Sequence, residues 1–593
     1  MTMHRYPSLA ALGGLAALAL LPLTALAQTA TETQALQPEE ATGRAVNEAV
    51  RAETMMVVAA NPLAAEAGFQ MLKEGGSAVD AMIATQLVLN LVEPQSSGIG
   101  GGAFLVYYDS ESGETITYDG REKAPLEAGP DLFLNDSGDP LSFWEAVVGG
   151  LSVGTPGTVR LLAEAHADHG LLEWSRLFQP AIELAENGFE VSPRLAGLLS
   201  GDTAERLRTY PRAREYFFPG GEPLQVGDTL RNPAFAETLR AIAEGGAAAF
   251  YTGPIAEDIV ETVRNAEGNP GLMALEDLEQ YAVVERPPVC APYRGYEVCG
   301  MGPPSSGGLT VGITLGILNH FDMAGFGPDT VDGWHLFAEA SKLAYADRNL
   351  YMADSDFVRM PTAGLLDPAY MTVRAQLVSF DRAAQTPVAA GNPPWTDAVR
   401  YGPDASNEQP GTSHISIVDA GGDVLSMTTT IESGFGSNLM VRGFLLNNEL
   451  TDFSFEPVNE GRPVANRVEP GKRPRSSMAP TIVFDEAGEP FLAIGSPGGS
   501  RIIPYVAKTI IGVIDWDLNV QEAINLGHVT NRNGDTDLEA GTEAEDLADP
   551  LRARGHTINV TDLTSGLHGI QFMEDGTLLG GADPRREGLA IGE

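Results

Sequence analysis

Residues 411–418 read Gly-Thr-Ser-His-Ile-Ser-Ile-Val and alternate between polar and apolar side chains. A turn sequence follows at 419–423 (Asp-Ala-Gly-Gly-Asp), and residues 424–430 read Val-Leu-Ser-Met-Thr-Thr-Thr. Two such runs on either side of a Gly-rich turn predict a β-hairpin. With the turn centred on Gly421, Thr412 pairs with Thr430, so two hydroxyl groups face each other at the open end of the hairpin.

Facing hydroxyls fill a protein core poorly but suit a nucleophile. A threonine that peptide cleavage turns into an N-terminus becomes a strong nucleophile, because its own α-amine can act as the base. The alternative is that Thr412 is present only because threonine favours strands. The motifs elsewhere in the chain favour the nucleophile.

Six further motifs accompany the hairpin, and each is a short cluster that carries little weight alone. In chain order they are Asp119-Gly120-Arg121-Glu122, Val153-Gly154-Thr155-Pro156-Gly157, Pro303-Pro304-Ser305-Ser306-Gly307-Gly308, Leu445-Leu446-Asn447-Asn448-Glu449-Leu450-Thr451-Asp452-Phe453, Arg475-Ser476-Ser477-Met478 and Gly495-Ser496-Pro497-Gly498-Gly499-Ser500-Arg501. Together, and in this order, they resemble the γ-glutamyltransferases, also called glutathione hydrolases, of the N-terminal-nucleophile hydrolase superfamily. The resemblance extends from about Met56 to Arg586.

This resemblance implies an α+β fold, a four-layer αββα sandwich. Periodicity alone predicts only helices before and after a block of paired strands, which fits a layered α+β architecture. The predicted helices are 62–73, 78–92 with Ser77 as the cap, 172–188, 233–244, 334–353 and 500–514. The predicted strands are 103–108, 413–419, 423–431, 443–447, 480–485 and 490–494.

The resemblance also implies that the precursor cuts itself between Gly411 and Thr412. The products would be a large subunit (28–411) and a small catalytic subunit (412–593), which remain assembled in one αββα domain. Thr430 would hydrogen-bond to Thr412 and position it. Gly498 and Gly499 would supply the oxyanion hole, because glycine lets backbone N–H groups approach a reacting oxygen closely. A plain strand-to-helix turn is the alternative and is compatible with that role.

The substrate end of the site follows from matching charges. A γ-glutamyl group carries an α-carboxylate, which Arg121 could clasp with two parallel hydrogen bonds, helped by the hydroxyls of Ser476 and Ser477. Its α-ammonium would be held by Glu449 and Asp452. Surface ion pairs are the alternative for each of these charged residues taken alone.

The chain departs from the family pattern in two places. Glu432 stands two residues beyond Thr430, where the family usually has an asparagine that contacts the donor's amino group. Three carboxylates around one ammonium crowd negative charge, so Glu432 is expected to be partly protonated or turned elsewhere, for instance towards Arg442. The segment between Asp452 and Ser476 is also short, which would leave the donor pocket more open.

The predicted function is that of a γ-glutamyltransferase. It would cleave glutathione and other γ-glutamyl compounds through a γ-glutamyl-threonine ester and pass the acyl group to water, an amino acid or a peptide, with no metal or cofactor. An acylase acting on another amide, such as a cephalosporin-type side chain, is the alternative, and Glu432 is the reason to retain it. A binding protein that has lost catalysis is the second alternative.

The N-terminus resembles a secretory signal, with His4 and Arg5 before an apolar run from Leu9 to Leu20. A cleavage site at 25–27 follows, so residues 1–27 are predicted to be a signal peptide and the protein to be exported, periplasmic or extracellular. A retained membrane anchor is the alternative; no later segment is predicted to cross a membrane. The 37 basic and 80 acidic residues give a net charge of −43, which argues against nucleic acid as a partner.

Two smaller features remain. The acidic stretch 535–549 is predicted to be an exposed loop. Cys290 and Cys299 are the only cysteines, and they form either a disulfide, which an exported protein permits, or two free buried thiols.

Overall fold

The computed structural model describes residues 1–2, 43, 47–396, 399–404, 406 and 411–593. Apart from its first two residues, the predicted signal peptide therefore lies outside the described residues. Residues 38–593 form one compact unit. In the described part of the chain, no helix has both the length and the apolar character required to cross a membrane.

Two seven-stranded sheets form the centre of this unit, and each draws strands from both sides of residue 412. The first runs β1 (Val50–Ala52), β22 (Leu578–Ala582), β21 (His568–Phe572), β17 (Pro490–Gly495), β16 (Thr481–Phe484), β9 (Tyr296–Gly300) and β8 (Val289–Tyr293). The second runs β23 (Leu589–Gly592), β2 (Met56–Ala59), β10 (Thr412–Val418), β11 (Val424–Thr430), β3 (Gly102–Asp109), β4 (Glu114–Gly120) and β7 (Val284–Arg286). A cut before Thr412 would therefore leave both subunits joined through both sheets.

The predicted hairpin is confirmed, register included. β10 and β11 pair antiparallel with Thr412 opposite Thr430 and Val418 opposite Val424. The hairpin is central because β2 pairs with β10 and β3 with β11 on its outer sides. Every residue of both strands is buried.

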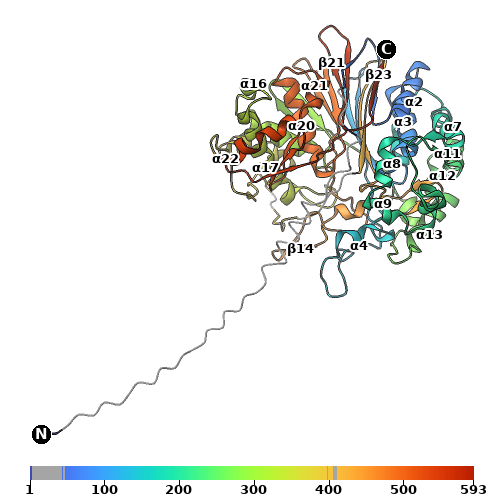
Figure 1. Cartoon of the computed structure of the whole chain (residues 1–593), viewed down its shortest axis with the longest axis horizontal. Coiled ribbons are helices and arrows are strands. Elements are labelled where there is room, and N and C mark those ends of the chain that lie inside the picture. Colours follow the sequence, from blue (N-terminus) through green and yellow to red (C-terminus); the bar gives the residue numbers. More distant parts are fainter. Residues whose placement is uncertain (3–42, 44–46, 397–398, 405, 407–410) are drawn as a thin grey trace. The chain divides into compact units, whose positions relative to one another are not determined.

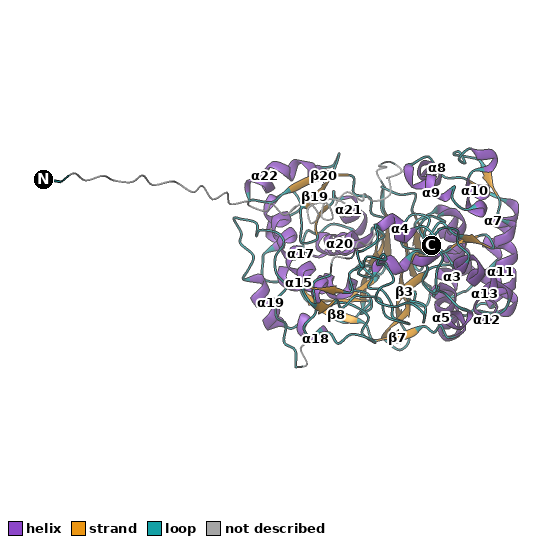
Figure 2. Cartoon of the chain, turned by 90° about the horizontal axis from the view of Figure 1, so that it is seen from below, coloured by secondary structure: helices purple, strands orange, loops and turns teal. Residues whose placement is uncertain are grey.

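Alternate residues of the second sheet enter two different cores, as the two-residue repeat of a strand requires. Val57 and Leu105 pack with helices α2 (Pro62–Lys73) and α3 (Ala78–Val92). Val58 and Val106 pack with the first sheet and with helices α15 (Gly307–Leu318), α17 (Val331–Tyr351) and α20 (Ile502–Ile514). The strands thus lie between a group of helices around α17 and α20 and another around α2 and α3 (Figures 1 and 2).

The helix predictions hold with adjusted ends. Helix α2 has the predicted bounds, and Ser77 caps α3 in a capping box with Asp80. The predicted helix 172–188 is two helices, α6 (Trp174–Leu177) and α7 (Gln179–Asn187), with Pro180 in the first turn of the second. A proline there lacks only an N–H that has no intrahelical partner in any case.

The remaining elements are short or peripheral. The helices are α4 (Phe143–Val147), α5 (Thr158–His169), α8 (Pro193–Leu199), α9 (Asp202–Leu207), α10 (Pro211–Phe217), α11 (Pro233–Gly245), α12 (Ala248–Tyr251), α13 (Pro254–Arg264), α14 (Leu275–Glu279), α16 (Met323–Phe326), α18 (Thr362–Leu365), α19 (Pro368–Ala375), α21 (Val520–Asn525) and α22 (Ala548–Ala553). The strands are β5 (Phe189–Glu190), β6 (Thr229–Leu230), β12 (Met440–Val441), β13 (Phe444–Leu445), β14 (Val458–Asn459), β15 (Arg462–Pro463), β18 (Val529–Asn531), β19 (Thr536–Glu539) and β20 (Ile558–Thr561).

The prediction of an exposed acidic loop at 535–549 holds for the exposure of its second half, in which Glu543, Glu545 and Asp549 are exposed, and is wrong for its first half. This stretch contains β19, in which Asp537 and Glu539 are buried. Arg501 pairs with Asp537 at 2.9 Å, and Arg585 pairs with Glu539 at 2.6 Å. Buried carboxylates persist where a cation compensates them, and both cations come from distant parts of the sequence.

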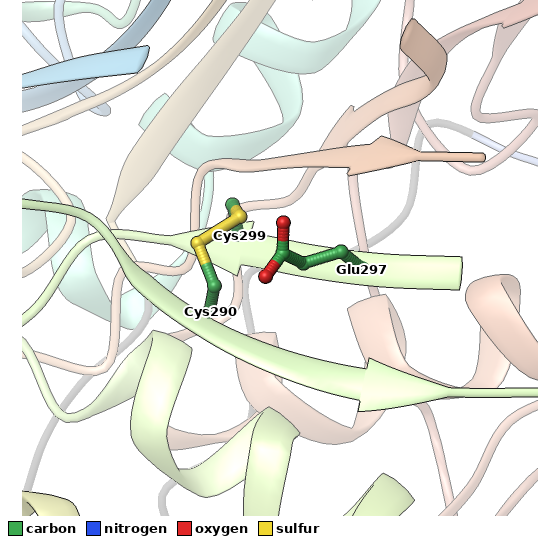
Figure 3. A group of neighbouring side chains, drawn as sticks. All are labelled: Cys290, Glu297 and Cys299. Atoms are coloured by element: carbon green, nitrogen blue, oxygen red, sulfur yellow. A yellow bond between two sulfur atoms is a disulfide. The ribbon is translucent and has the colours of Figure 1, made fainter. Parts of the chain in front are cut away.

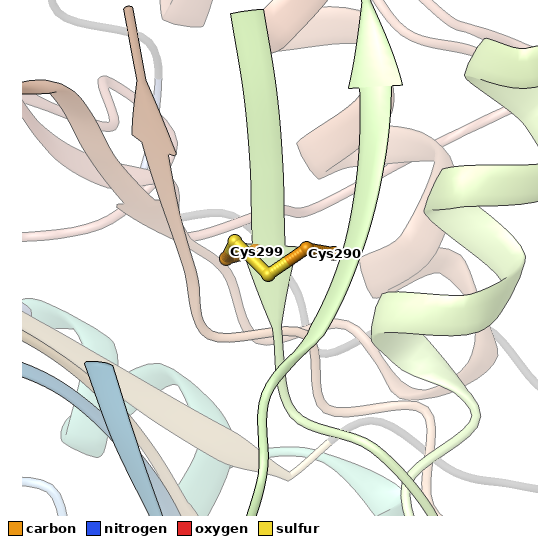
Figure 4. Close-up of a disulfide and its surroundings, with 2 residues drawn as sticks. All are labelled: Cys290 and Cys299. Atoms are coloured by element: carbon orange, nitrogen blue, oxygen red, sulfur yellow. A yellow bond between two sulfur atoms is a disulfide. The ribbon is translucent and has the colours of Figure 1, made fainter. Parts of the chain in front are cut away.

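The two cysteines form a disulfide that joins β8 to β9 (Figure 4). Cys290 and Cys299 are directly paired residues of this antiparallel pair. Glu297 lies beside them (Figure 3) and completes a group of metal-binding residue types. Because the disulfide occupies both sulfur atoms, they have no thiolate to offer a metal ion.

Candidate functional site

A short chain of hydroxyl groups leads from Thr412 to its own preceding carbonyl group. The Thr412 hydroxyl donates to Thr430 Oγ1 at 3.4 Å, and the Thr430 hydroxyl donates to the Gly411 carbonyl oxygen at 2.8 Å. The backbone N–H of Glu432 donates to the same Thr430 oxygen at 2.8 Å, which fixes that hydroxyl in place. The predicted pair of threonines is therefore in contact beside the Gly411–Thr412 peptide bond.

The residue before Thr412 has room for no side chain. A Cβ atom at Gly411 would lie 2.1 Å from the Glu432 carbonyl oxygen. This close approach accounts for a glycine at the predicted cleavage position, since any other residue would displace the peptide bond that Thr430 contacts.

The Gly498–Gly499 turn lies between β17 and α20. Both glycines have positive φ, 136° and 56°, a conformation that other residues rarely adopt. Gly499 lines the same small cavity as Thr412, and α20 begins three residues later at Ile502. This strand-to-helix turn is the geometry in which backbone N–H groups can face a reacting oxygen.

Arg121 lies just after β4 and is fully buried among acids. Its terminal nitrogens donate to Glu449 and Asp452, the latter at 2.5 Å. Its remaining donors reach the carbonyl oxygens of Pro474 and Arg475 at 3.2 and 3.1 Å. The predicted clamp residues are therefore together, and in the uncut chain they are bonded to one another.

Two serines complete this wall of the cavity. Ser477 Oγ accepts a hydrogen bond from the buried Arg348 at 2.7 Å, and Arg348 also donates to Ser306 Oγ at 2.8 Å. Ser306 in turn donates to the backbone carbonyl of Ser476 at 2.6 Å. The Pro-Pro-Ser-Ser-Gly-Gly motif thus supports the Arg-Ser-Ser-Met motif from behind.

Glu432 lines the cavity from a position just beyond strand β11. Strand β11 ends at Thr430, and Glu432 follows with a φ of 78°, outside the strand. Its carboxylate accepts from Asn448 Nδ2 at 2.7 Å and from Ser433 Oγ at 2.6 Å. Arg442, the suggested alternative partner, forms its ion pair with Asp258.

Burial shifts the ionisation of the acids around Arg121. It raises the pKa of Glu122 to about 7, although the neighbouring Arg121 guanidinium opposes the shift. It also raises the pKa of Glu449 well above its ordinary value, again against Arg121, while the carboxylates of Glu122 and Glu432 add to the rise. Because these acids disfavour each other's ionisation, protons are retained here near neutral pH.

Nine of the ten predicted site residues line one cavity of about 20 Å³. The tenth, Gly498, directly precedes Gly499, which is one of the nine. The lining residues are Arg121, Thr412, Thr430, Glu432, Glu449, Asp452, Ser476, Ser477, Met478, Gly499 and Ile502. A larger apolar cavity of about 680 Å³ lies between α17 and α19 and contains none of them. Converging polar groups, rather than volume, identify the candidate site.

Comparison with known proteins identifies the family. The model of the family described as gamma-glutamyltranspeptidase matches residues 64–593. The chain belongs to this family. A glutathione hydrolase proenzyme of Bacillus subtilis (strain 168) is 39% identical over 554 residues, which cover 91% of each chain. An acylase ACY 1 proenzyme of Pseudomonas sp. (strain V22) is 35% identical and covers 90% of this chain and 93% of its own.

A solved structure gives the same fold. The crystal structure of cephalosporin acylase from Bacillus halodurans superposes with a TM-score of 0.81 at 27% identity. The match covers 94% of this chain and 99% of the acylase. The α+β prediction is confirmed at the level of mixed helices and sheets in an N-terminal-nucleophile family.

Sequence reasoning missed a set of residues behind the family site. Arg586 donates to the Thr412 carbonyl oxygen at 3.1 Å, and Glu93 accepts from Ser413 Oγ at 3.1 Å. The run Asp583-Pro584-Arg585-Arg586 near the C-terminus, with two adjacent arginines in an acidic chain, was the signal that could have drawn attention to it.

A second group of metal-binding residue types does not line the small cavity that contains Thr412. His335, Glu339 and His556 are all buried and close together. His335 Nδ1 and His556 Nε2 are 2.7 Å apart and hydrogen-bonded, and Glu339 accepts from Lys342 at 2.6 Å. Their polar atoms thus already bond to protein groups.

Proposed function

We propose that the chain is a self-processing γ-glutamyl hydrolase and transferase that acts on glutathione and related γ-glutamyl amides. The observation that carries the proposal is the hydroxyl chain from Thr412 through Thr430 to the Gly411 carbonyl, placed in one cavity with the Arg121 clamp. Membership of the gamma-glutamyltranspeptidase family supports it.

Self-cleavage begins at the Gly411–Thr412 peptide bond. The Thr412 hydroxyl oxygen attacks the Gly411 carbonyl carbon while the Thr430 hydroxyl, already hydrogen-bonded to that carbonyl oxygen, stabilises the developing charge. The C–N bond breaks, the Thr412 nitrogen takes the proton that the attacking hydroxyl gives up, and an ester forms at Thr412 Oγ1. Water then hydrolyses the ester, which leaves a carboxylate on Gly411 and a free amine on Thr412.

When the donor binds, its charged groups replace the partners in an existing cluster of ion pairs. In the uncut chain, Arg121 is bonded to Glu449 and Asp452, and the cavity of about 20 Å³ is far smaller than the roughly 300–1,000 Å³ of ordinary ligand pockets. Departure of the Gly411 carbonyl opens this space. The donor's α-carboxylate then binds the Arg121 guanidinium and the hydroxyls of Ser476 and Ser477. Its α-ammonium binds the carboxylates of Glu449 and Asp452.

Acyl transfer uses the groups that cleavage has exposed. The Thr412 amine accepts the hydroxyl proton while the oxygen attacks the donor's γ-carbonyl carbon. Backbone N–H groups at Gly498 and Gly499 receive the oxyanion, and the leaving amine takes the proton from the Thr412 ammonium. Water or an amino-acid or peptide amine then accepts the γ-glutamyl group from the ester. The chain's own groups carry every proton and charge, so the proposal includes no metal or cofactor.

The same proposal assigns residues 28–411 and 412–593 to the two subunits of one αββα sandwich. Interleaving of early and late strands in both sheets supports continued assembly after the cut. The sequence of residues 1–27 supports removal of a signal peptide and export to the periplasm or the medium.

An acylase acting on cephalosporin-type amides is the second candidate, because acylases are among the relatives and Glu432 alters the donor pocket. Purified protein should be assayed against a γ-glutamyl anilide and a cephalosporin-type amide side by side. Turnover of the anilide, with none of the cephalosporin amide, is the expected result. The reverse preference would replace the γ-glutamyl proposal with the acylase.

A further inference from the structure

The carbonyl group of Thr412 is held by a buried arginine. Arg586 lies between β22 and β23, is 5% exposed, and donates from Nη1 to the Thr412 oxygen at 3.1 Å. Its Nε donates to the Ser565 carbonyl oxygen at 3.1 Å, so the guanidinium is fixed from two sides. A buried arginine on the backbone carbonyl of a β-strand calls for an explanation, because desolvating the charge is costly.

The next residue along the strand is held by the opposite charge. Glu93, at the C-terminal end of α3, is 1% exposed and accepts from Ser413 Oγ at 3.1 Å. Arg194, 2% exposed, approaches the other Glu93 oxygen at 3.4 Å. Two arginines and one glutamate therefore meet behind the first two residues of the small subunit, a group that we call the rear cluster (Glu93, Arg194 and Arg586).

The group that contacts the Thr412 backbone differs in charge from most of the donor pocket: it is the cation Arg586. On the cavity side, Arg121 faces three acids, Glu432, Glu449 and Asp452. Behind the strand, burial raises the pKa of Glu93 to about 7, against the Arg586 charge, so this acid carries only part of its negative charge near neutral pH. Other charged or titratable groups on this side are Glu587, which accepts from the Arg194 backbone N–H; Asp583 and Tyr505, which interact electrostatically with Arg586; and His568, whose pKa burial lowers to about 4.

We propose that Arg586 is a positioning residue for the N-terminal nucleophile: it fixes the Thr412 carbonyl and keeps the α-amine that cleavage creates neutral enough to act as the base. The inference rests on the proposed function. Holding the carbonyl sets the rotation about the Cα–C bond of Thr412, and thus where the amine lies relative to Oγ1. A guanidinium beside the amine disfavours the ammonium form, whereas the acids of the donor pocket favour it.

The test replaces Arg586 by methionine, which keeps length without charge, and by lysine, which keeps charge. The titration of the Thr412 amine is read from its rate of carbamylation by cyanate between about pH 5 and pH 9, by mass spectrometry of the small subunit's N-terminal peptide. The acid limb of kcat/KM for a γ-glutamyl anilide is measured in parallel. Arg374→Met, a buried arginine paired with Asp347 and absent from the site, is the matched control.

In Arg586→Met we expect the amine titration and the acid limb to move to higher pH by about one unit. Turnover near neutral pH should fall about fivefold to tenfold with KM changed less than about twofold, because substrate contacts are intact. Arg586→Lys should move the limb by less than half as much, and Arg374→Met should not move it.

An unmoved amine titration in a cleaved Arg586→Met enzyme would overturn the inference and leave the proposed function intact. If neither Arg586 variant is cleaved although both unfold at the wild-type temperature, the charge role is contradicted, since lysine retains it. If only the lysine variant is cleaved, the charge role is supported. A wild-type chain that is never cut would refute the proposed function itself.

Discussion

The two sides of Thr412 present different charged groups to it: acids line the cavity in front, and an arginine contacts its carbonyl oxygen behind. In front, the donor pocket sets Arg121 against Glu449 and Asp452, with Glu122 3.9 Å away. Behind, the rear cluster sets Arg194 and Arg586 around Glu93, whose pKa is raised. An acid-rich wall suits a donor that carries an ammonium, while an arginine-rich wall suits an amine that must stay neutral. The acids in front favour the protonated form of the base that such a nucleophile supplies, and the arginine behind disfavours it.

The largest expected effect comes from replacing Arg121, the cation of the donor pocket. Arg121→Lys should process normally but lose γ-glutamyl turnover more than about a hundredfold, at least about 3 kcal/mol, because an ammonium cannot bond a carboxylate in two parallel contacts. Steady-state kinetics with a γ-glutamyl anilide measures it. Arg294→Lys, whose arginine pairs with Asp515 outside the cavity, is the control. Near wild-type turnover in Arg121→Lys would mean that the donor carboxylate binds elsewhere.

The rear cluster should make folding stability depend on pH. Burial raises the pKa of Glu93 from 4.5 to about 7, so the folded state binds this proton more tightly than the unfolded chain. The resulting stability is full below about pH 4.5 and is lost as the pH rises through about 7, a loss of roughly 3 kcal/mol. Glu93→Gln should remove that loss.

Denaturant unfolding at about pH 5 and pH 8 compares the two chains, in an uncut background so that the subunits stay joined. Glu489→Gln, at an exposed position, is the control and should leave the pH dependence as in the parent. An equal fall in stability for the parent and Glu93→Gln would contradict a raised Glu93 pKa.

A smaller effect follows from the tight packing at the cleavage position. Gly411→Ala places a Cβ atom 2.1 Å from the Glu432 carbonyl, so the scissile peptide must shift away from Thr430. Self-cleavage should slow at least about tenfold, because a small misplacement of reacting groups costs this much. Timed denaturing gels report the ratio of precursor to subunits. Gly197→Ala in α8, where a Cβ meets nothing within 4 Å, should cleave at the wild-type rate. Equal rates for both variants would exclude this packing constraint.

The smallest expected change sharpens the role of Glu432. Glu432→Gln removes one negative charge from the donor pocket but keeps an oxygen for Asn448, so KM for a γ-glutamyl anilide should rise about fivefold with little change in kcat. A matched glutaryl anilide, which lacks the α-ammonium, should not distinguish the variant from the parent. A rise in KM for both substrates would show that Glu432 shapes the pocket without binding the ammonium.

The front of the site was predictable because its residues lie in short, distinctive motifs. The Thr412–Thr430 pairing followed from two seven-residue strand-like runs and the Gly-rich turn between them, and it holds in the structure. Glu432 was expected near the carboxylates of the donor pocket, and it lines the same cavity; its φ of 78° depends on tertiary contacts with Gly411 and Asn448 that no local pattern specifies.

The back of the site could not be predicted for the same reason. The residues of the rear cluster, Glu93, Arg194 and Arg586, lie far apart in the sequence. Taken alone, each resembles an ordinary charged residue of a protein surface. The prediction for the acidic stretch 535–549 failed at β19 for the same reason. The acids of this strand are buried because Arg501 and Arg585 compensate their charges. In a chain of net charge −43, the burial of Asp537 and Glu539 depends on arginines that only the folded chain brings to them.

Replacement of Thr412 by alanine tests the central claim most directly, with Thr412→Ser as the control that keeps a hydroxyl. Intact-mass measurement of the purified Thr412→Ala protein should give one uncut chain, since no oxygen remains to attack the Gly411 carbonyl. The Thr412→Ser protein should still yield two subunits, with the substituted residue at the new N-terminus. Normal two-subunit processing of Thr412→Ala would contradict the assignment of Thr412 as the nucleophile.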